Sequence, residues 1–170
     1  MNVYPYWKIC VNTLVRYYTM NIHKDFQDFL KSLNDEGVEF VIIGGYAVAF
    51  HGYIRNTGDL DIFFRNISTN IQKIKKALIS FGFNDQSIEL GDFYKLGNII
   101  RMGIAPIRIE MLNDISGTTF DEVWSSRVHG LYDDVPVNYI GLKELLSNKK
   151  ASGRPKYLLD VEELDASKQQ

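Results

Sequence analysis

Two short apolar runs in the first half of the chain constrain the fold more than any other feature. The first, at 38–43, is rich in β-branched and aromatic residues and is followed directly by Gly44-Gly45. The second, at 60–64, includes Asp61 and directly follows Asp59. Short apolar runs bounded by glycine or polar residues are typical of buried β-strands. The chain is therefore expected to form a sheet with glycines and aspartates at the ends of neighbouring strands.

Helical and strand-like patterns alternate along the rest of the chain. Apolar residues at helical spacing between Phe26 and Leu33 predict a first helix, and Gly37 lies where a helix end favours a left-handed residue. Further helices are expected at 46–51, from an N-cap at Asn66 or Ser68 to Gly82, and at 120–124, 141–150 and 155–165, and further strands at 99–102, 107–112, 127–131 and 135–139, with turns at 105–106, 133–134 and 152–153. This order predicts an α/β (α+β) fold with a mixed sheet flanked by helices, ending in C-terminal helices.

The length and composition indicate one compact unit. The chain has 170 residues, 45% of them hydrophobic, which is enough for a single core. We expect residues 20–166 to form a single domain, and residues 1–19 to be an N-terminal extension whose order the sequence leaves open. The net charge of -2 argues against a protein that coats nucleic acid and against a disordered acidic chain.

Cysteine content and hydropathy indicate the compartment. Cys10 is the only cysteine, so the chain forms no internal disulfide and no cysteine-rich zinc site. No apolar run approaches the roughly 20 residues of a membrane helix, and the N-terminus lacks the order of a secretory signal. We therefore expect a cytoplasmic protein without a membrane partner.

The two aspartates of the second run point to a metal site. Side chains alternate along a strand, so Asp59 and Asp61 share one side while Leu60 and Ile62 point into the core. Their Cα atoms would lie about 6.5–7 Å apart. Two carboxylates at that spacing repel each other, and a hard cation such as Mg²⁺ relieves the repulsion. The alternative is a solvated strand edge or turn, where Asp-x-Asp is common.

The two glycines suggest a phosphate site. Gly44 and Gly45 leave bare backbone N–H groups at the start of a short predicted helix, where phosphate oxygens bind well. A triphosphate could then lie on this turn with its metal on the aspartates, an arrangement suited to phosphoryl-group chemistry. The alternative is an ordinary glycine turn after a strand.

Together, Gly44-Gly45 and Asp59-Leu-Asp-Ile62 resemble the signature of the DNA polymerase beta-type nucleotidyltransferase superfamily. The pattern through Arg55 and Thr57 is similar to that of small bacterial nucleotidyltransferases that include the abortive-infection type IV toxins. The resemblance implies a nucleotidyltransferase fold, with nucleotide phosphates bound at the glycines, Arg55 and Thr57, and Mg²⁺ or Mn²⁺ on the aspartates.

The same resemblance implies an activity and partners. A nucleoside monophosphate would move from a nucleoside triphosphate (NTP) to a hydroxyl group of RNA, such as a tRNA end, of a protein or of a small molecule. The setting would be a toxin–antitoxin or phage-defence system, with a cognate toxin or antitoxin as partner. The alternative is a catalytically inactive nucleotide-binding or partner-binding module of the same fold.

Members of this superfamily usually carry a third carboxylate on a later strand. Glu110 alternates with Ile109 and Met111, so it faces the cleft if those two fill the core. The resemblance makes Glu110 the general base and, with Asp59 and Asp61, a metal ligand. The alternative for Glu110 is an exposed strand charge. Asp114 is a competing candidate, but turn chemistry explains it.

The C-terminal segment carries a cluster of basic residues. The resemblance assigns Lys149, Arg154 and Lys156 to contacts with triphosphate or a nucleic-acid backbone, and Asp160 to orienting one of them. The alternative is a solvated helix-turn-helix face.

Two further residues keep two interpretations each. His51 either contacts nucleotide or serves the structure at a helix end. Arg55 either binds phosphate or pairs with Asp59.

Overall fold

The computed structural model describes residues 23–104 and 107–167. The predicted extension at 1–19, with Cys10, and the predicted turn at 105–106 lie outside the described residues. Within the described parts, none of the helices combines the length and apolar character of a membrane span.

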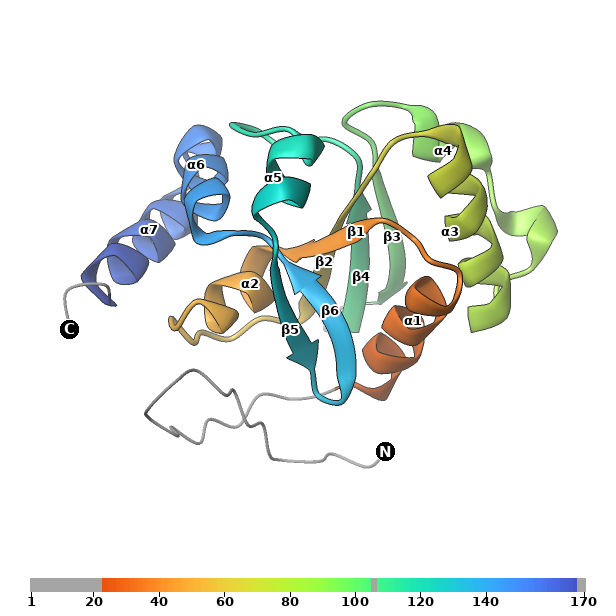
Figure 1. Ribbon diagram of the computed structural model, residues 1–170, viewed down its shortest axis with the longest axis horizontal. Coiled ribbons are helices and arrows are strands. Elements are labelled where there is room, and N and C mark those ends of the chain that lie inside the picture. Colours follow the sequence, from red (N-terminus) through yellow and green to blue (C-terminus); the bar gives the residue numbers. More distant parts are fainter. Residues whose placement is uncertain (1–22, 105–106, 168–170) are drawn as a thin grey trace.

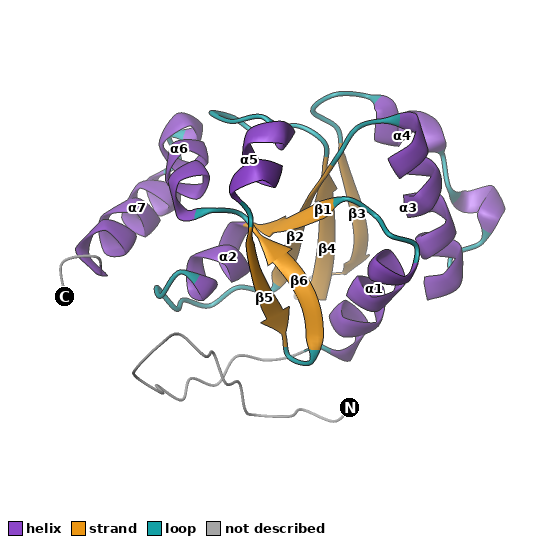
Figure 2. Cartoon of the chain, in the orientation of Figure 1, coloured by secondary structure: helices purple, strands orange, loops and turns teal. Residues whose placement is uncertain are grey.

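A six-stranded mixed sheet forms the centre of the molecule (Figures 1 and 2). The strands are β1 (Phe40–Ile43), β2 (Asp59–Phe64), β3 (Ile99–Ile104), β4 (Ile107–Leu112), β5 (Val128–Tyr132) and β6 (Val135–Tyr139). Their order across the sheet is β3-β4-β2-β1-β6-β5. Strand β2 runs antiparallel to β1 and parallel to β4, while β1 runs parallel to β6. Two antiparallel pairs, β3 with β4 and β5 with β6, complete the sheet.

Helices flank this sheet. They are α1 (Lys24–Asp35), α2 (Gly44–Phe50), α3 (Ser68–Phe81), α4 (Leu90–Tyr94), α5 (Phe120–Ser126), α6 (Leu142–Ser152) and α7 (Pro155–Ser167), with a 3-10 turn η1 at Asp85–Ser87. Helices α1 and α3 pack side by side, and α6 and α7 lie together on the other side of the view in Figure 1. The predicted α/β (α+β) fold, a mixed sheet flanked by helices with helices at the C-terminus, is confirmed.

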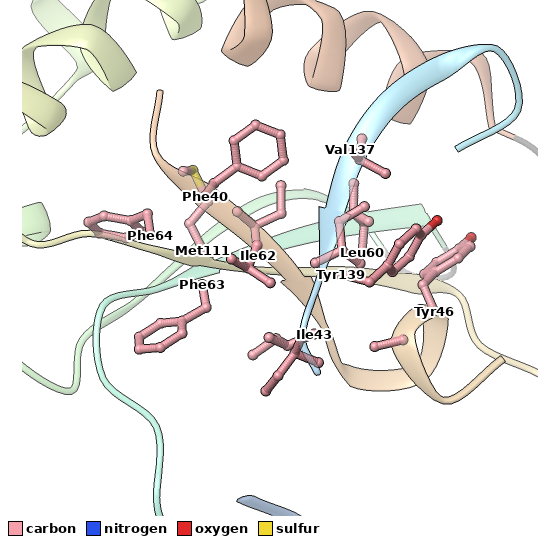
Figure 3. Packing of buried hydrophobic residues seen from close by; sticks show 14 of the residues in the cluster. Phe40, Ile43, Tyr46, Leu60, Ile62, Phe63, Phe64, Met111, Val137 and Tyr139 are labelled. Atoms are coloured by element: carbon pink, nitrogen blue, oxygen red, sulfur yellow. The ribbon is translucent and has the colours of Figure 1, made fainter. Parts of the chain in front are cut away.

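The hydrophobic core follows from the alternation of side chains along the strands. All four residues of β1 are buried, and so are Leu60, which lies between Asp59 and Asp61 on β2, and Ile62. Figure 3 shows labelled side chains of four strands and α2 packed together: Phe40, Ile43, Tyr46, Leu60, Ile62, Phe63, Phe64, Met111, Val137 and Tyr139. Because these side chains fill the interior, the polar residues between them on β2 and β4 must face outward.

The start of α3 differs from the prediction. The N-cap is Ile67, whose side chain accepts no hydrogen bond, so the expected cap at Asn66 or Ser68 is wrong. The side chain of Asn70 instead accepts from the backbone N–H of Glu39 and donates to the carbonyls of Glu39 and Arg65. This buried amide ties the first turn of α3 to the sheet, so local capping is not what begins the helix.

Other boundaries moved by a few residues. Strand β1 begins at Phe40, two residues later than the apolar run suggested, and α2 begins directly at Gly44. Helix α4 and the turn η1 were not predicted, because elements of five and three residues are too short to show a helical period. The expected hairpin at 127–139 and the C-terminal helices are confirmed, with Gly153 as a left-handed C-cap.

A buried ionic cluster attaches α7 to the rest of the structure. The carboxylate of Asp160 is fully buried and accepts two hydrogen bonds from Arg55, at 2.6 Å and 3.0 Å. The ammonium of Lys149 on α6 lies 2.8 Å from the same carboxylate, with 1% of that lysine side chain exposed. Burial alone would raise the pKa of Asp160, but the bonds from Arg55 and Lys149 outweigh it and lower the pKa. The cluster therefore joins α6, α7 and the loop before β2.

Replacing Asp160 with asparagine should destabilise the protein strongly. The change leaves the buried Lys149 ammonium without its counter-charge, which typically costs about 3–5 kcal/mol. The free energy of unfolding from urea titration measures the effect. A matched control is Asp165→Asn, because Asp165 pairs with Lys150 at 3.9 Å where both side chains are about half exposed. That control should cost less than about 1 kcal/mol, and an equal cost for both variants would contradict the role of the cluster.

Candidate active site

Strand β2 presents two carboxylates on one side. Asp59 and Asp61 alternate with the buried residues Leu60 and Ile62, as the periodicity predicted. Both carboxylates therefore leave the sheet on the face opposite that part of the core.

Strand β4 places a third carboxylate beside them. In the parallel pairing of β2 with β4, Glu110 lies opposite Asp61 and Arg108 lies opposite Asp59. Ile109 and Met111 are buried, so Glu110 and Arg108 share the outward face. The expectation that Glu110 faces the two aspartates agrees with this register.

The glycine turn lies against the aspartates because β1 pairs with β2. Ile43 lies opposite Asp61, and Gly44 follows it with a φ of 65°. A Cβ on Gly44 would lie 1.8 Å from Oδ2 of Asp61, and one on Gly45 would lie 2.5 Å from Oγ1 of Thr57. The two glycines are thus required by close approach of the Asp61 and Thr57 side chains, a reason that the sequence pattern did not reveal.

These residues surround one polar cavity of about 300 Å³. It is lined by Gly44, Gly45, Arg55, Thr57, Asp59, Asp61, Ile99, Arg101, Arg108, Glu110, Arg154, Lys156 and Tyr157. Nine of the ten predicted site residues are in this lining, and Lys149 is the exception. A larger hollow of about 490 Å³ lies over α1 and the end of α3, but none of the predicted site residues lines it.

The three carboxylates influence one another electrostatically. Burial raises the pKa of Asp61 to about 7, and the negative charges of Glu110 and Asp59 add to the rise. The charge of Lys149 and a hydrogen bond from the backbone of Gly45 offset part of it. A cation in the cavity would therefore relieve the unfavourable negative charge on Asp61.

Two arginines that the sequence analysis did not assign neutralise the other carboxylates. Nη2 of Arg108 donates to Oδ2 of Asp59 at 2.7 Å and lies 3.1 Å from Oε1 of Glu110. Nε of Arg101 on β3 donates to the same Oε1 at 2.9 Å. The alternation that placed Glu110 on the outward face also placed Arg108 there, so this signal was present in the sequence. The position of Arg101 depends on the register of β3 with β4, which periodicity does not give.

The donors fit a divalent metal ion by type. Asp59, Asp61 and Glu110 supply hard carboxylate oxygens on adjacent strands, and burial together with the negative charges of Glu110 and Asp59 raises the pKa of Asp61. Within residues 23–104 and 107–167, however, no three such side chains are grouped closely enough to hold one ion as they stand. Binding at all three would therefore require the contacts of Arg108 to Asp59 and Glu110 to open.

The C-terminal basic residues divide into two groups. Arg154 and Lys156 are exposed and line the cavity, where phosphate contacts remain a prediction. Lys149 is buried against Asp160, and its ammonium lies 4.0 Å from the ring centre of Tyr157. Burial lowers the pKa of Lys149, although Asp160 opposes this effect. Asp160 thus orients Lys149, as the resemblance suggested, and Lys149 acts on the cavity from behind its lining.

Three other predicted interpretations can be compared with the geometry. Arg55 does not pair with Asp59, because its guanidinium is held by Asp160, so that interpretation is wrong. His51 makes a 2.7 Å hydrogen bond with the carbonyl of Ile140 and is not part of the cavity lining, which favours its structural role. Asp114 is exposed and also lies outside the lining, which leaves Glu110 as the third carboxylate.

A mixed sheet that brings two strand aspartates, a third carboxylate and a glycine turn into one cavity is the arrangement that the nucleotidyltransferase resemblance implies. The sequence matches the family described as "Nucleotidyl transferase of unknown function (DUF2204)" over residues 22–165. The protein belongs to this family.

Comparison with solved structures finds a protein from Thermotoga maritima that is described as a candidate nucleotidyltransferase. It is 15% identical, covers 85% of this chain and 88% of its own, and superposes with a TM-score of 0.49. No curated protein matches the sequence.

Replacing Gly44 with alanine should cost far more stability than a backbone effect alone. Gly153 is the matched control, because its φ of 62° is close to the 65° of Gly44 and a Cβ there would have no described atom within 4 Å. We expect Gly153→Ala to cost about 1–2 kcal/mol. Gly44→Ala should cost at least about 2 kcal/mol more, because the methyl group collides with Asp61. Urea denaturation of both variants measures the difference. Equal costs would show that the Asp61 side chain moves away from the methyl group without loss of stability.

The stability of the protein should fall as Asp61 loses its proton. The folded-state pKa of about 7 lies above the ordinary value of 3.8, so the folded protein holds this proton more tightly than the unfolded chain does. This contribution to the free energy of unfolding is fully present below about pH 4 and is lost as the pH rises through 7. The uncharged variant Asp61→Asn should therefore melt above the wild type at pH 8 and above it by a clearly smaller margin at pH 5.

Thermal melting at the two pH values tests this expectation. Asp114→Asn is the control, because it makes the same chemical change at an exposed loop position outside the cavity lining. A wild-type advantage over Asp61→Asn at pH 8 would contradict the unfavourable charge at Asp61.

Proposed function

We propose that the protein is a metal-dependent nucleotidyltransferase that moves a nucleoside monophosphate from an NTP to a hydroxyl acceptor. One observation carries the proposal: Asp59, Asp61 and Glu110 lie on paired strands beside the Gly44-Gly45 turn, in one cavity. Membership of a nucleotidyl transferase family supports the same reaction class.

The charges around the cavity suit a triphosphate. Arg154 and Lys156 are exposed, line the cavity and form no ion pair with a carboxylate of the described residues, while Arg55 reaches the lining from its bond to Asp160. Cationic side chains and carboxylates that line the same cavity would orient an anionic nucleotide and its divalent ion. We assign phosphate binding to Arg55, Arg154 and Lys156, together with Thr57 and the glycine turn in the same lining.

The proposed reaction is an in-line displacement. The acceptor hydroxyl oxygen forms a bond to the α-phosphorus, and the bond from that phosphorus to the oxygen bridging to the β-phosphate breaks, so that pyrophosphate leaves. We assign the proton of the hydroxyl to Glu110, the carboxylate opposite Asp61. Mg²⁺ or Mn²⁺ held by Asp59, Asp61 and Glu110 would supply positive charge beside the reacting phosphate.

The acceptor and the cellular role belong to the same proposal. The acceptor is the hydroxyl of an RNA such as a tRNA end, of a protein or of a small molecule. We place the activity in the cytoplasm, in a toxin–antitoxin or phage-defence system with a cognate partner, on the resemblance to abortive-infection type IV toxins. Growth arrest on induced expression that Asp61→Ala abolishes would support a toxin, whereas labelling of a co-encoded protein would support an antitoxin.

Transfer of label from an NTP tests the reaction directly. The full chain is incubated with each labelled NTP, Mg²⁺ or Mn²⁺, and cell extract, and the extract is then separated into RNA, protein and small molecules. We expect one of these fractions to carry label, and to carry it only when the metal is present. Asp59→Ala should lower the rate at least about 100-fold, the usual scale for losing a group that stabilises transition-state charge.

Asp114→Asn is the matched control and should keep the wild-type rate, because Asp114 lies outside the cavity lining. Absence of label from every fraction, with either metal and in both the wild type and Asp59→Ala, would count against the proposal.

A second candidate function is a nucleotide-binding or partner-binding module of the same fold without turnover. The contacts of Arg108 and Arg101 to Asp59 and Glu110 favour it, because they occupy the carboxylates that catalysis needs. Calorimetry that detects tight NTP binding in a preparation that transfers no label would support this alternative.

A further inference from the structure

Arg108 occupies the position between two of the three carboxylates in the cavity. A single nitrogen of its guanidinium, Nη2, is within 2.7 Å of Asp59 and 3.1 Å of Glu110. The two carboxylates belong to different strands, so this one cation bridges β2 and β4 at the point where their negative charges converge. The position is thus filled by a positive charge that belongs to the chain itself.

The strand register determines which residues surround Arg108. The register places it opposite Asp59 and two residues before Glu110, on the same face as both. Its Nε is buried and has no hydrogen-bond partner among the described residues, and its side chain is 33% exposed. A buried N–H without a partner is costly, so the conformation of Arg108 is held by its two ion pairs at the expense of this donor.

Arg101 offers a contrast within the same cavity. It contacts only Glu110, through Nε at 2.9 Å, and 54% of its side chain is exposed. Its charge therefore lies farther into solvent than that of Arg108, where screening weakens its attraction to a carboxylate. Of the two arginines, Arg108 alone contacts both Asp59 and Glu110 in the part of the chain that the structure describes.

We propose that Arg108 is an internal counter-ion that competes with a divalent metal ion for Asp59 and Glu110. A cation that binds both carboxylates must first displace the guanidinium, and its binding energy is reduced by the two ion pairs that it breaks. The carboxylate cluster therefore has a weaker affinity for a divalent ion than its three negative charges would produce. The inference rests on the proposed function only in treating Asp59, Asp61 and Glu110 as a cation-binding cluster.

Binding of Mn²⁺ to the full chain in the absence of nucleotide tests the competition. Electron paramagnetic resonance of free Mn²⁺ gives the dissociation constant without any catalytic step. Arg108→Gln removes the competing charge and should bind Mn²⁺ at least about tenfold more tightly than the wild type, given the strength of a unit charge acting across a few ångströms. The matched control, Arg101→Gln, removes a charge that contacts Glu110 alone and should change the affinity less than about threefold.

A second variant covers the case in which Arg108→Gln does not fold, as judged by circular dichroism and thermal melting. Arg108→Lys keeps the positive charge but lacks the guanidinium, and it should bind Mn²⁺ more tightly than the wild type by a smaller factor.

Three outcomes would overturn the proposal. The folded Arg108 variant binds Mn²⁺ no more tightly than the wild type, neither protein binds Mn²⁺, or Arg101→Gln gains as much affinity as Arg108→Gln. The Mn²⁺ titration contains no nucleotide and no acceptor. Its result therefore remains valid even if the protein transfers no label from an NTP. Conversely, equal Mn²⁺ affinity of the Arg108 variant and the wild type would reject the competition but would not contradict the proposed transfer reaction.

Discussion

Strand β2 pairs with β1 on one side and with β4 on the other, and the site depends on this double pairing. The antiparallel register brings Ile43 and the glycine turn to Asp61, while the parallel register brings Glu110 to the same residue. The burial of Leu60 and Ile62 fixes which face of β2 is outward, because a slip of one residue would turn both aspartates into the core. The six residues of β2 therefore have to pack the interior on one face and supply the cavity on the other, and a single register satisfies both.

Two groups of cationic side chains offset the negative charge of the carboxylates in the cavity. Arg108 and Arg101 act directly on the carboxylates from within the sheet. Arg55 approaches from the loop before β2 and Lys149 from α6, and Asp160 of α7 holds both of them. The C-terminal helices thus contribute to the electrostatics of the cavity through a buried cluster, although most of their surface is solvated. A charged site in a small domain needs such compensation, because uncompensated charges at partial burial oppose folding.

Much of the fold and part of the site could be predicted from the sequence. Periods of two and of about 3.6 residues located the strands and the longer helices, and alternation put Glu110 on the face of the aspartates. The N-cap of α3 was missed because Asn70 bonds to a strand that is distant in sequence. The burial of Lys149 was missed because a basic run at a helix turn is usually solvated, and only the docking of α7 encloses it.

The sequence by itself determined the faces of the strands and the residue types that could serve the site. Asp59, Asp61, Arg108 and Glu110 are outward because buried neighbours alternate with them, and that period is local. Only the tertiary structure decided which charges meet. Arg108 and Asp59 are 49 residues apart, and Arg55 and Asp160 are 105 apart, so strand register and helix docking select these partners. The alternation of buried and exposed residues along one strand shows which face is outward. It does not show which other strand or helix packs beside that face, so it cannot predict these contacts.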